Sequence, residues 1–201
     1  MRGRGQSSPG WKDKRVAVMG LARSGIAACL FLRKRGARVL GTDRGTAFEL
    51  ASVSAELQAA GVELSLGGHP DLKGFDAIVH CAAYVEEWGP WADYWRVNVD
   101  GTKELLVAAK GADVKRFVHI GTEAALFYGQ HMRGVDEHYP LALNSPYPYS
   151  RTKAHAEKAV REANDPSSGF TTIVVRPRFV WGPGDQTILP AVKAMVEKGQ
   201  F

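Results

Sequence analysis

A tyrosine and a lysine four residues apart could act together in proton transfer. Tyr149 and Lys153 begin a segment with helical spacing, and a separation of four places both side chains on one helix face. A free phenol, with a pKa of about 10, is a poor base at neutral pH, whereas a neighbouring ammonium lowers that pKa. Thr122, just past an expected strand, could hydrogen-bond a substrate oxygen beside Tyr149. The trio predicts acid-base chemistry, with a solvated helix face as the alternative for the Tyr-Lys pair.

A turn with two glycines, between an apolar run and an expected helix, predicts a phosphate site. Gly20 would permit the tight turn, and Gly25 would let helix and strand approach closely. Free N–H groups at the helix start would face the phosphates. Ala22 stands where the GxGxxG pattern has glycine, and its Cβ could crowd a pyrophosphate. The alternative is a plain strand-turn-helix in which Ser24 caps the helix.

Two charged residues at the end of the second expected strand bear on the choice of nucleotide. Asp43 lies 18 residues past Gly25 and is placed to accept hydrogen bonds from a ribose diol. Arg44 beside it could instead attract a 2′-phosphate. NAD and NADP therefore both stay open as cofactors, and a solvated Asp-Arg pair is the alternative.

These residues fall at the ends of elements in an alternating pattern of strands and helices. Short β-branched runs predict six strands: Arg15–Met19, Ala37–Gly41, Val62–Leu66, Ala77–His80, Arg116–Ile120 and Thr171–Arg176. Helical spacing of apolar residues predicts helices over Gly25–Gly36, Ala47–Ala60, Trp91–Ala109, Tyr149–Ala163 and Thr187–Lys198. The alternation predicts an α/β fold with a doubly wound, parallel, Rossmann-like sheet of about six strands in three layers. We expect a flexible tail over 1–14 and a single domain over 15–201.

Composition excludes several other classes of protein. The net charge is +5, but acidic and basic residues are interspersed, so no nucleic-acid partner is expected. No stretch approaches about 18 consecutive apolar residues, and no membrane association is expected. Cys29 and Cys81 form no CxxC pair, which favours the cytoplasm. The histidines are scattered, and His80 and His119 are expected to have core or strand-end roles rather than to bind metal.

Several motifs, in order, resemble the extended short-chain dehydrogenase/reductase family, particularly its 3β-hydroxysteroid dehydrogenase and NAD-dependent epimerase branches. They cover about residues 78–200. Val79–Ala83 resembles a VHxAA strand end, Asn98–Thr102 an NVxGT segment, Ser145–Tyr149 the start of an SPYxxSK segment, and Arg176–Asp185 an RPxxVYGPGD loop.

The resemblance implies roles for individual residues. Thr122 and Tyr149 would hold the reacting oxygen, with Tyr149 as acid or base, while Lys153 would lower the tyrosine pKa and bind the nicotinamide ribose. Further cofactor contacts are implied for Cys81, Ala82, Ala83, Asn98, Lys153, Arg176 and Pro177. The cofactor would be NAD or NADP and the reaction a weak oxidation of a secondary alcohol. The helices over 91–109 and 149–163 often form a dimer interface in this family, so a homodimer stays open.

The first 78 residues depart from that family. The phosphate turn is shorter than the family's TGxxGxxG, and residues 61–79 join two strands without a helix between them. This part resembles instead the N-terminal domain of UDP-N-acetylmuramoyl-alanine:D-glutamate ligase, which binds a UDP-sugar. We therefore hypothesise an engineered or recombined chimera joined near residues 76–82, with a ligase-like half over 15–79 and a dehydrogenase-like half over 80–201. Because the dehydrogenase family continues into a substrate-binding region, activity is expected to be impaired, with a sugar-nucleotide-binding module or a folded chain without turnover as the alternatives.

Overall fold

Six parallel strands form one sheet in the order β3-β2-β1-β4-β5-β6, in a computed structural model that describes residues 10–86, 88–182, 185 and 188–200. The strands are β1 (Arg15–Met19), β2 (Arg38–Asp43), β3 (Glu63–Leu66), β4 (Ala77–His80), β5 (Arg116–Ile120) and β6 (Thr171–Val175). The direction in which successive strands are added reverses between β1 and β4. In open α/β sheets, ligands bind in the crevice that such a reversal leaves at the carboxyl ends of the strands.

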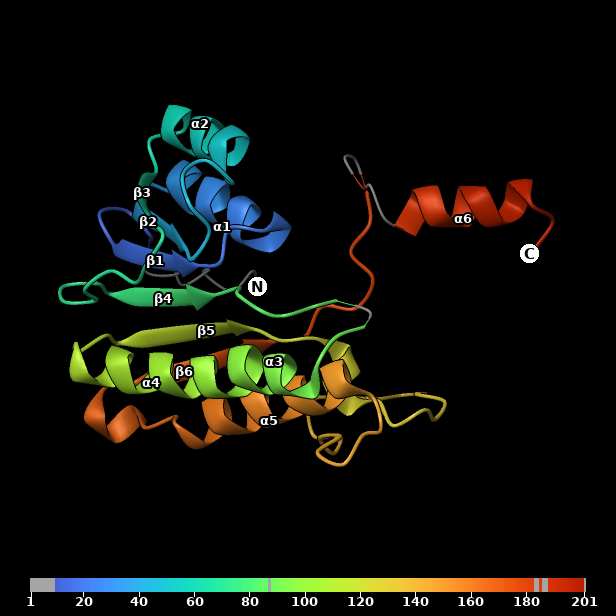
Figure 1. Cartoon of the computed structure of the whole chain (residues 1–201). Coiled ribbons are helices and arrows are strands. Elements are labelled where there is room, and N and C mark those ends of the chain that lie inside the picture. Colours follow the sequence, from blue (N-terminus) through green and yellow to red (C-terminus); the bar gives the residue numbers. More distant parts are fainter. Residues whose placement is uncertain (1–9, 87, 183–184, 186–187, 201) are drawn as a thin grey trace, which may run out of the picture.

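Helices cover both faces of the sheet, as Figure 1 shows: α1 and α2 lie over one face, and α3, α4 and α5 over the other. The bounds are α1 (Arg23–Lys34), α2 (Ala51–Ala59), α3 (Trp91–Trp95), α4 (Gly101–Gly111), α5 (Pro148–Glu162) and α6 (Ile188–Glu197). Short turns are η1 (Arg96–Asp100, a π-helix) and the 3₁₀ turns η2 (Glu123–Leu126) and η3 (Pro166–Ser168). The predicted three-layer, doubly wound α/β fold is confirmed. None of the helices described is long and apolar enough to cross a membrane.

Each face of the sheet has its own apolar core, because successive strand residues point to opposite sides. Val16 and Val18 pack with α1 and α2, whereas Ala17 packs with the core beneath α4 and α5, which also contains Ile78 and Phe117. All five side chains are fully buried. A strand covered on both faces is apolar at consecutive positions, as a buried parallel sheet requires. The two cores hold the carboxyl ends of the strands rigidly in place.

The predicted helix over 91–109 begins at the expected residue but is not uniform. A π-helical turn, Arg96–Asp100, separates α3 from α4 and buries Asn98 and Val99. Such turns occur often at functional sites. The helix predicted from Ala47 instead begins at Ala51, because Glu49 Oε2 accepts the backbone N–H of Thr46 at 2.7 Å and closes a separate turn.

Residues 67–76 contain no helix, so the predicted direct connection between β3 and β4 is confirmed. Leu72 and Phe75 bury their side chains in the core beneath α4. A cavity of about 620 Å³ lies between this connection and the helix pair η1 and α4. Its volume falls within the range of small-molecule sites, about 300–1,000 Å³.

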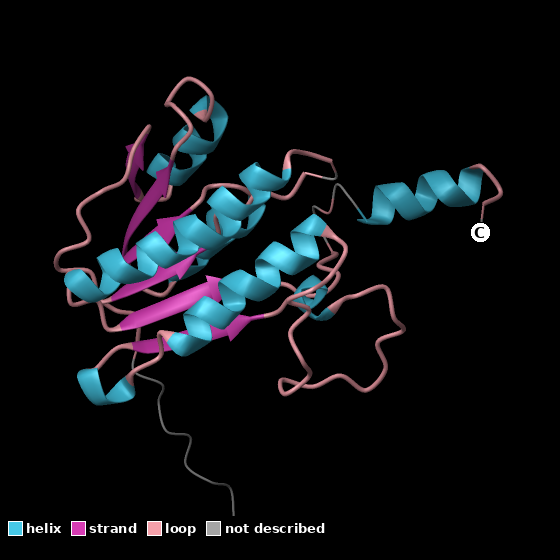
Figure 2. Cartoon of the chain, turned by 60° about the horizontal axis from the view of Figure 1, so that its bottom comes forward, coloured by secondary structure: helices cyan, strands magenta, loops and turns pink. Residues whose placement is uncertain are grey.

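At the two ends of the chain, the structure agrees only in part with the expected tail over 1–14 and the expected helix over 187–198. Residues 10–14 are not a free tail: Trp11 packs against the core beneath α1, Asp13 N–H donates to Gly36 at 2.9 Å, and Lys14 pairs with Asp76 at 3.0 Å. Residues 1–9, Pro183, Gly184 and Thr187 lie outside the described part of the chain. α6 lies apart from the sheet in both views (Figure 1 and Figure 2), and none of its residues is buried.

Candidate active site

The turn between β1 and α1 requires glycine at both expected positions. Gly20 has a φ of +94°, and a Cβ there would lie 2.6 Å from backbone atoms of Ala82. A Cβ on Gly25 would lie 1.8 Å from the carbonyl oxygen of Gly20. α1 follows the exposed Ala22 with no acidic residue in its first turn, and no side chain, Ser24 included, caps it among the described residues. The positive end of the helix dipole therefore faces the turn, as an anion site requires.

The segment after β4 lies against this turn. The N–H groups of Cys81 and Ala82 both donate to the carbonyl of Met19 at 2.8 Å. Ala82 thereby packs directly on Gly20, and Ala83 follows half-buried. The predicted residues of the turn and of the β4 end thus meet in the crevice between β1 and β4.

Asp43 is fixed beside the same turn. Its two carboxylate oxygens accept the backbone N–H groups of Leu21 at 2.7 Å and Gly45 at 2.8 Å. A carboxylate has about four acceptor positions, so both oxygens can accept further hydrogen bonds. Arg44 is exposed and borders the cavity beside α4.

Tyr149 and Thr122 lie together at the end of β5. Burial raises the pKa of Tyr149, and the nearby Thr122 side chain, which favours the phenolate, offsets this only in part. The net shift is therefore upward, because removal of the phenolate from water outweighs its stabilisation; the expected lowering of this pKa by Lys153 stays a prediction. Thr122 also accepts the N–H of Ala124 at 3.2 Å as the cap of η2.

Lys153 is almost completely buried one helical turn after Tyr149. Its Nζ donates to the carbonyl of Ile120 at 3.0 Å and lies 3.4 Å from Nε2 of His119. Burial lowers the pKa of Lys153 to about 8. A lysine on a solvated helix face would show neither this burial nor this anchoring to a strand end, so that alternative is excluded.

Asn98, in the π-helical turn, joins the segment after β4 to α5. Its Oδ1 accepts the N–H of Tyr84 at 2.7 Å, and its Nδ2 lies 3.1 Å from both the Tyr84 carbonyl and Oγ1 of Thr152. In this structure the amide positions neighbouring elements, whereas the resemblance implies a cofactor contact. Tyr84 and Thr152 were not predicted, since one sequence gives no signal for partners so distant in the chain.

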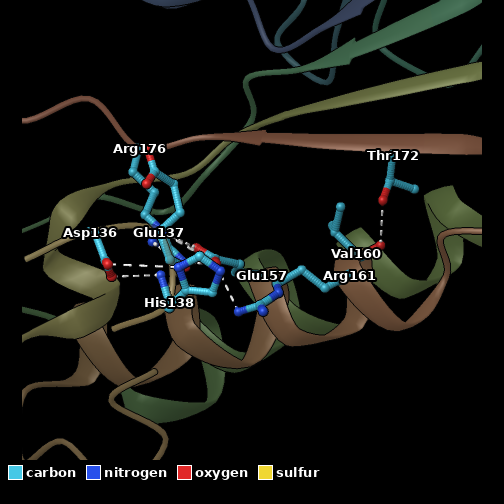
Figure 3. A network of polar contacts seen from close by, with 8 residues as sticks. All are labelled: Asp136, Glu137, His138, Glu157, Val160, Arg161, Thr172 and Arg176. Carbon is cyan, nitrogen blue, oxygen red and sulfur yellow. Dashed lines mark hydrogen bonds and ion pairs between the residues drawn. The ribbon is translucent and has the colours of Figure 1, made fainter. Parts of the chain in front are cut away.

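Arg176, directly after β6, forms a two-point ion pair with Glu157 of α5 (Figure 3). Its Nε lies 2.9 and 3.1 Å from the two carboxylate oxygens, and Glu157 is fully buried. The carbonyl of Pro177 accepts the N–H of Glu123 at 3.2 Å. Both residues, predicted as cofactor contacts, therefore tie the chain after β6 to α5 and η2. Glu157 was not predicted, because a charged residue on a polar helix is typical of a solvated face.

A family model decides the assignment. The model described as the 3-beta hydroxysteroid dehydrogenase/isomerase family matches residues 69–201, more than half of the chain. The chain belongs to this family. The match includes Thr122, Tyr149 and Lys153, and it confirms the resemblance identified over about residues 78–200.

Curated relatives of this 3-beta hydroxysteroid dehydrogenase/isomerase family member are oxidoreductases by name. A 4-hydroxy-2-methyl-3-oxo-4-farnesyl-3,4-dihydroquinoline-1-oxide ketoreductase from Stigmatella aurantiaca is 42% identical over 130 residues, which cover 65% of this chain and 38% of the relative. A 2-alkyl-3-oxoalkanoate reductase from Stenotrophomonas maltophilia is 33% identical over 187 residues, covering 88% of this chain and 54% of the relative. The chain thus spans between about a third and a half of the lengths of these two relatives.

Solved structures share the fold. A short-chain dehydrogenase/reductase superfamily protein from Agrobacterium tumefaciens, crystallised with bound NAD, has a TM-score of 0.65 and 28% identity. The similarity covers 81% of this chain and 48% of that one.

The comparisons give no support to a chimera or to a ligase-like first half. The alignment with the Stenotrophomonas maltophilia reductase covers 88% of this chain, so it must cross the junction suggested near residues 76–82. One relative therefore accounts for both sides of that junction. The absence of a helix between β3 and β4 is a local feature of this chain within a sheet that it shares with its relatives. The sequence patterns in this region were therefore misleading about the origin of the first half.

Proposed function

We propose that this chain binds a nicotinamide dinucleotide in the crevice between β1 and β4 and serves hydride transfer between the cofactor and a secondary alcohol or ketone. The observation that carries the proposal is the placement of Tyr149. It lies beside Thr122 and one turn from the buried Lys153, at the carboxyl edge of the sheet that also holds the glycine turn. Acid-base groups and a phosphate site at one edge are what such a reaction requires.

The cofactor site is assembled from residues already in place. The Gly20–Gly25 turn would hold the pyrophosphate, Asp43 the adenosine ribose and Lys153 the nicotinamide ribose. The fixed carboxylate of Asp43 would repel a 2′-phosphate, which favours NAD over NADP, while the exposed Arg44 makes NADP the second candidate. When bound, the nicotinamide supplies or accepts the hydride.

The proton chemistry follows from Tyr149. Its raised pKa keeps the phenol protonated at neutral pH, so the hydroxyl can donate a proton to a carbonyl oxygen that Thr122 also binds. In the oxidative direction the same side chain must accept a proton. The ammonium of Lys153, one turn away, favours the phenolate in that direction.

We infer an apolar ketone or secondary alcohol as the substrate class. The curated relatives are named for the reduction of ketones on alkyl and farnesyl-bearing skeletons. In this chain Phe179, Val180 and Trp181, just after β6, expose about two-thirds or more of their surface. Aromatic and aliphatic side chains near an active site suit an apolar substrate.

Titration of the purified chain with NADH, NADPH and UDP-N-acetylglucosamine, by calorimetry, tests the proposal. We expect saturable NADH binding in the millimolar range or tighter, with weaker NADPH binding. Tighter binding of the UDP-sugar than of either dinucleotide would favour a sugar-nucleotide-binding module instead. Absence of any dinucleotide binding at millimolar concentration would exclude the oxidoreductase function.

Three properties remain predictions. Cys29 and Cys81 are both free, which supports a reducing compartment such as the cytoplasm. A single domain over 15–201 would unfold in one cooperative transition, which calorimetry can measure. A homodimer through α4 and α5 is suggested by the family likeness alone, and sedimentation equilibrium would test it.

A further inference from the structure

Two histidines at the ends of adjacent strands lie between Lys153 and α4. His80 on β4 and His119 on β5 are register partners, and their ring centroids are 5.2 Å apart. Both are buried. Nε2 of His119 lies 3.4 Å from Nζ of Lys153, and Nε2 of His80 lies 3.0 Å from Oγ1 of Thr102 on α4. Polar contacts therefore extend inward from both helices to these two rings.

The hydrogen bonds assign a tautomer to each ring. Thr102 donates its only hydroxyl proton to the carbonyl of Asn98 at 2.7 Å, so its oxygen must accept from His80, whose proton is on Nε2. The ammonium of Lys153 has only donors, so Nε2 of His119 accepts and the proton of that ring is on Nδ1. The two imidazoles are thus in opposite tautomers.

The two Nδ1 atoms complete the pattern. Each is buried without a hydrogen-bond partner in the part of the chain that the structure describes. In His119 this atom is a donor and in His80 an acceptor, so the two are complementary. Burial, followed by the charge of Lys153, lowers the pKa of His80 to about 3 and that of His119 well below its ordinary value, so both rings are neutral at pH 7.

We propose that His80 and His119 are positioning residues for Lys153: a neutral imidazole pair in complementary tautomers, joined through its Nδ1 atoms by one water, that holds the ammonium at the end of β5. The importance of Lys153 for catalysis rests on the proposed function, whereas the arrangement of the two histidines does not. The described residues contain no group of three metal-ligating side chains, so the pair is not assigned to a metal.

Few other groups compete for the ammonium. Cys81 and Glu157 favour its charged form. Glu157, however, is committed to Arg176 through two hydrogen bonds from Nε. The carbonyl of Ile120 and Nε2 of His119 are therefore the acceptors that fix the direction of the ammonium.

Side-chain ¹⁵N NMR of the full chain near neutral pH tests the tautomers. We expect His80 to be protonated on Nε2 and His119 on Nδ1, with each ring assigned by the loss of its signals in His80→Gln or His119→Gln. The same tautomer on both rings, or an imidazolium on either, overturns the proposal. The measurement needs no cofactor, so failure of NAD binding would overturn the proposed function and leave this result standing.

The pKa of Lys153, measured by ¹³C NMR and assigned by its absence in Lys153→Arg, tests the positioning role. His119→Leu removes an acceptor from the ammonium, and we expect that pKa to fall by about one pH unit. His119→Gln keeps an acceptor oxygen near the same place and should restore the original pKa. His155→Gln makes the same substitution on α5 instead of β5 and should leave the pKa of Lys153 unchanged. An unchanged pKa of Lys153 in His119→Leu overturns the proposal. If that variant does not fold, the tautomers measured in the wild-type chain test the proposal instead.

Discussion

The guanidinium of Arg176 holds the carboxylate of Glu157 from two sides, with Nε 2.9 and 3.1 Å from its two oxygens, and Glu157 has no exposed surface. Glu157 is one turn beyond Lys153 on α5. The ion pair therefore fixes α5, the helix that carries Tyr149 and Lys153, to the end of β6.

Arg176→Leu should destabilise the fold strongly, because it leaves the buried carboxylate of Glu157 with only the half-exposed guanidinium of Arg161, 3.9 Å away. Loss of one member of a buried pair costs about 3–5 kcal/mol, which urea unfolding would measure. Arg178→Leu is the matched control, because Arg178 is largely exposed in its pair with Glu123, and its loss should cost less than about 1 kcal/mol. Equal effects of the two substitutions would contradict the structural role given to Glu157.

Gly25→Ala should abolish dinucleotide binding and lower stability, because the new Cβ would lie 1.8 Å from the Gly20 carbonyl oxygen. Gly111→Ala, at the end of α4, places a Cβ in open space and should leave both properties unchanged. Circular dichroism and NADH titration of the two variants make the comparison. Normal NADH binding by folded Gly25→Ala would show that the turn does not form the cofactor site.

Tyr149→Phe should lower NAD-linked turnover by about 10²–10⁴-fold, the usual contribution of a general acid or base. The affinity for NADH should change little, since the phenol is assigned to the substrate oxygen. Tyr147→Phe is the control, because Tyr147 is half-exposed and stacks on Phe127. Unchanged turnover in Tyr149→Phe would remove Tyr149 from the mechanism.

Acid should destabilise the protein through its buried histidines. The pKa of His80 falls from 6.5 to about 3 on folding, so between these values the unfolded chain binds more protons than the folded chain. The free energy of unfolding therefore decreases as pH falls through this window, by up to about 1.4 kcal/mol per pH unit for this group. Urea midpoints at neutral and mildly acidic pH should show a smaller pH dependence in His80→Gln than in wild type. His138→Gln, at an exposed position, should keep the wild-type dependence, and a match between His80→Gln and wild type would contradict the prediction.

Local sequence patterns were sufficient to predict the strands of the sheet and the glycine turn between β1 and α1. Apolar β-branched runs marked β1, β4 and β5 at their observed bounds, because a strand buried on both faces is apolar at consecutive positions. Gly20 and Gly25 were predictable because a side chain at either position would collide with neighbouring backbone atoms.

The features that were not predicted depend on contacts between segments that are distant in the sequence. The π-helical turn is held by hydrogen bonds that Asn98 accepts from Tyr84 and donates to Tyr84 and to Thr152, which is 54 residues away. Lys153 and Glu157 are four apart and look like a surface ion pair; only packing against the sheet buries them. The raised pKa of Tyr149 has the same origin, because burial cannot be judged from the spacing of two residues.

A crystal structure of the chain grown with saturating NAD tests the central claim most directly. We predict density for the pyrophosphate over the Gly20–Gly25 turn and for the nicotinamide ribose within hydrogen-bonding distance of Nζ of Lys153. NAD bound elsewhere on the chain, with no density over the turn, would contradict the account.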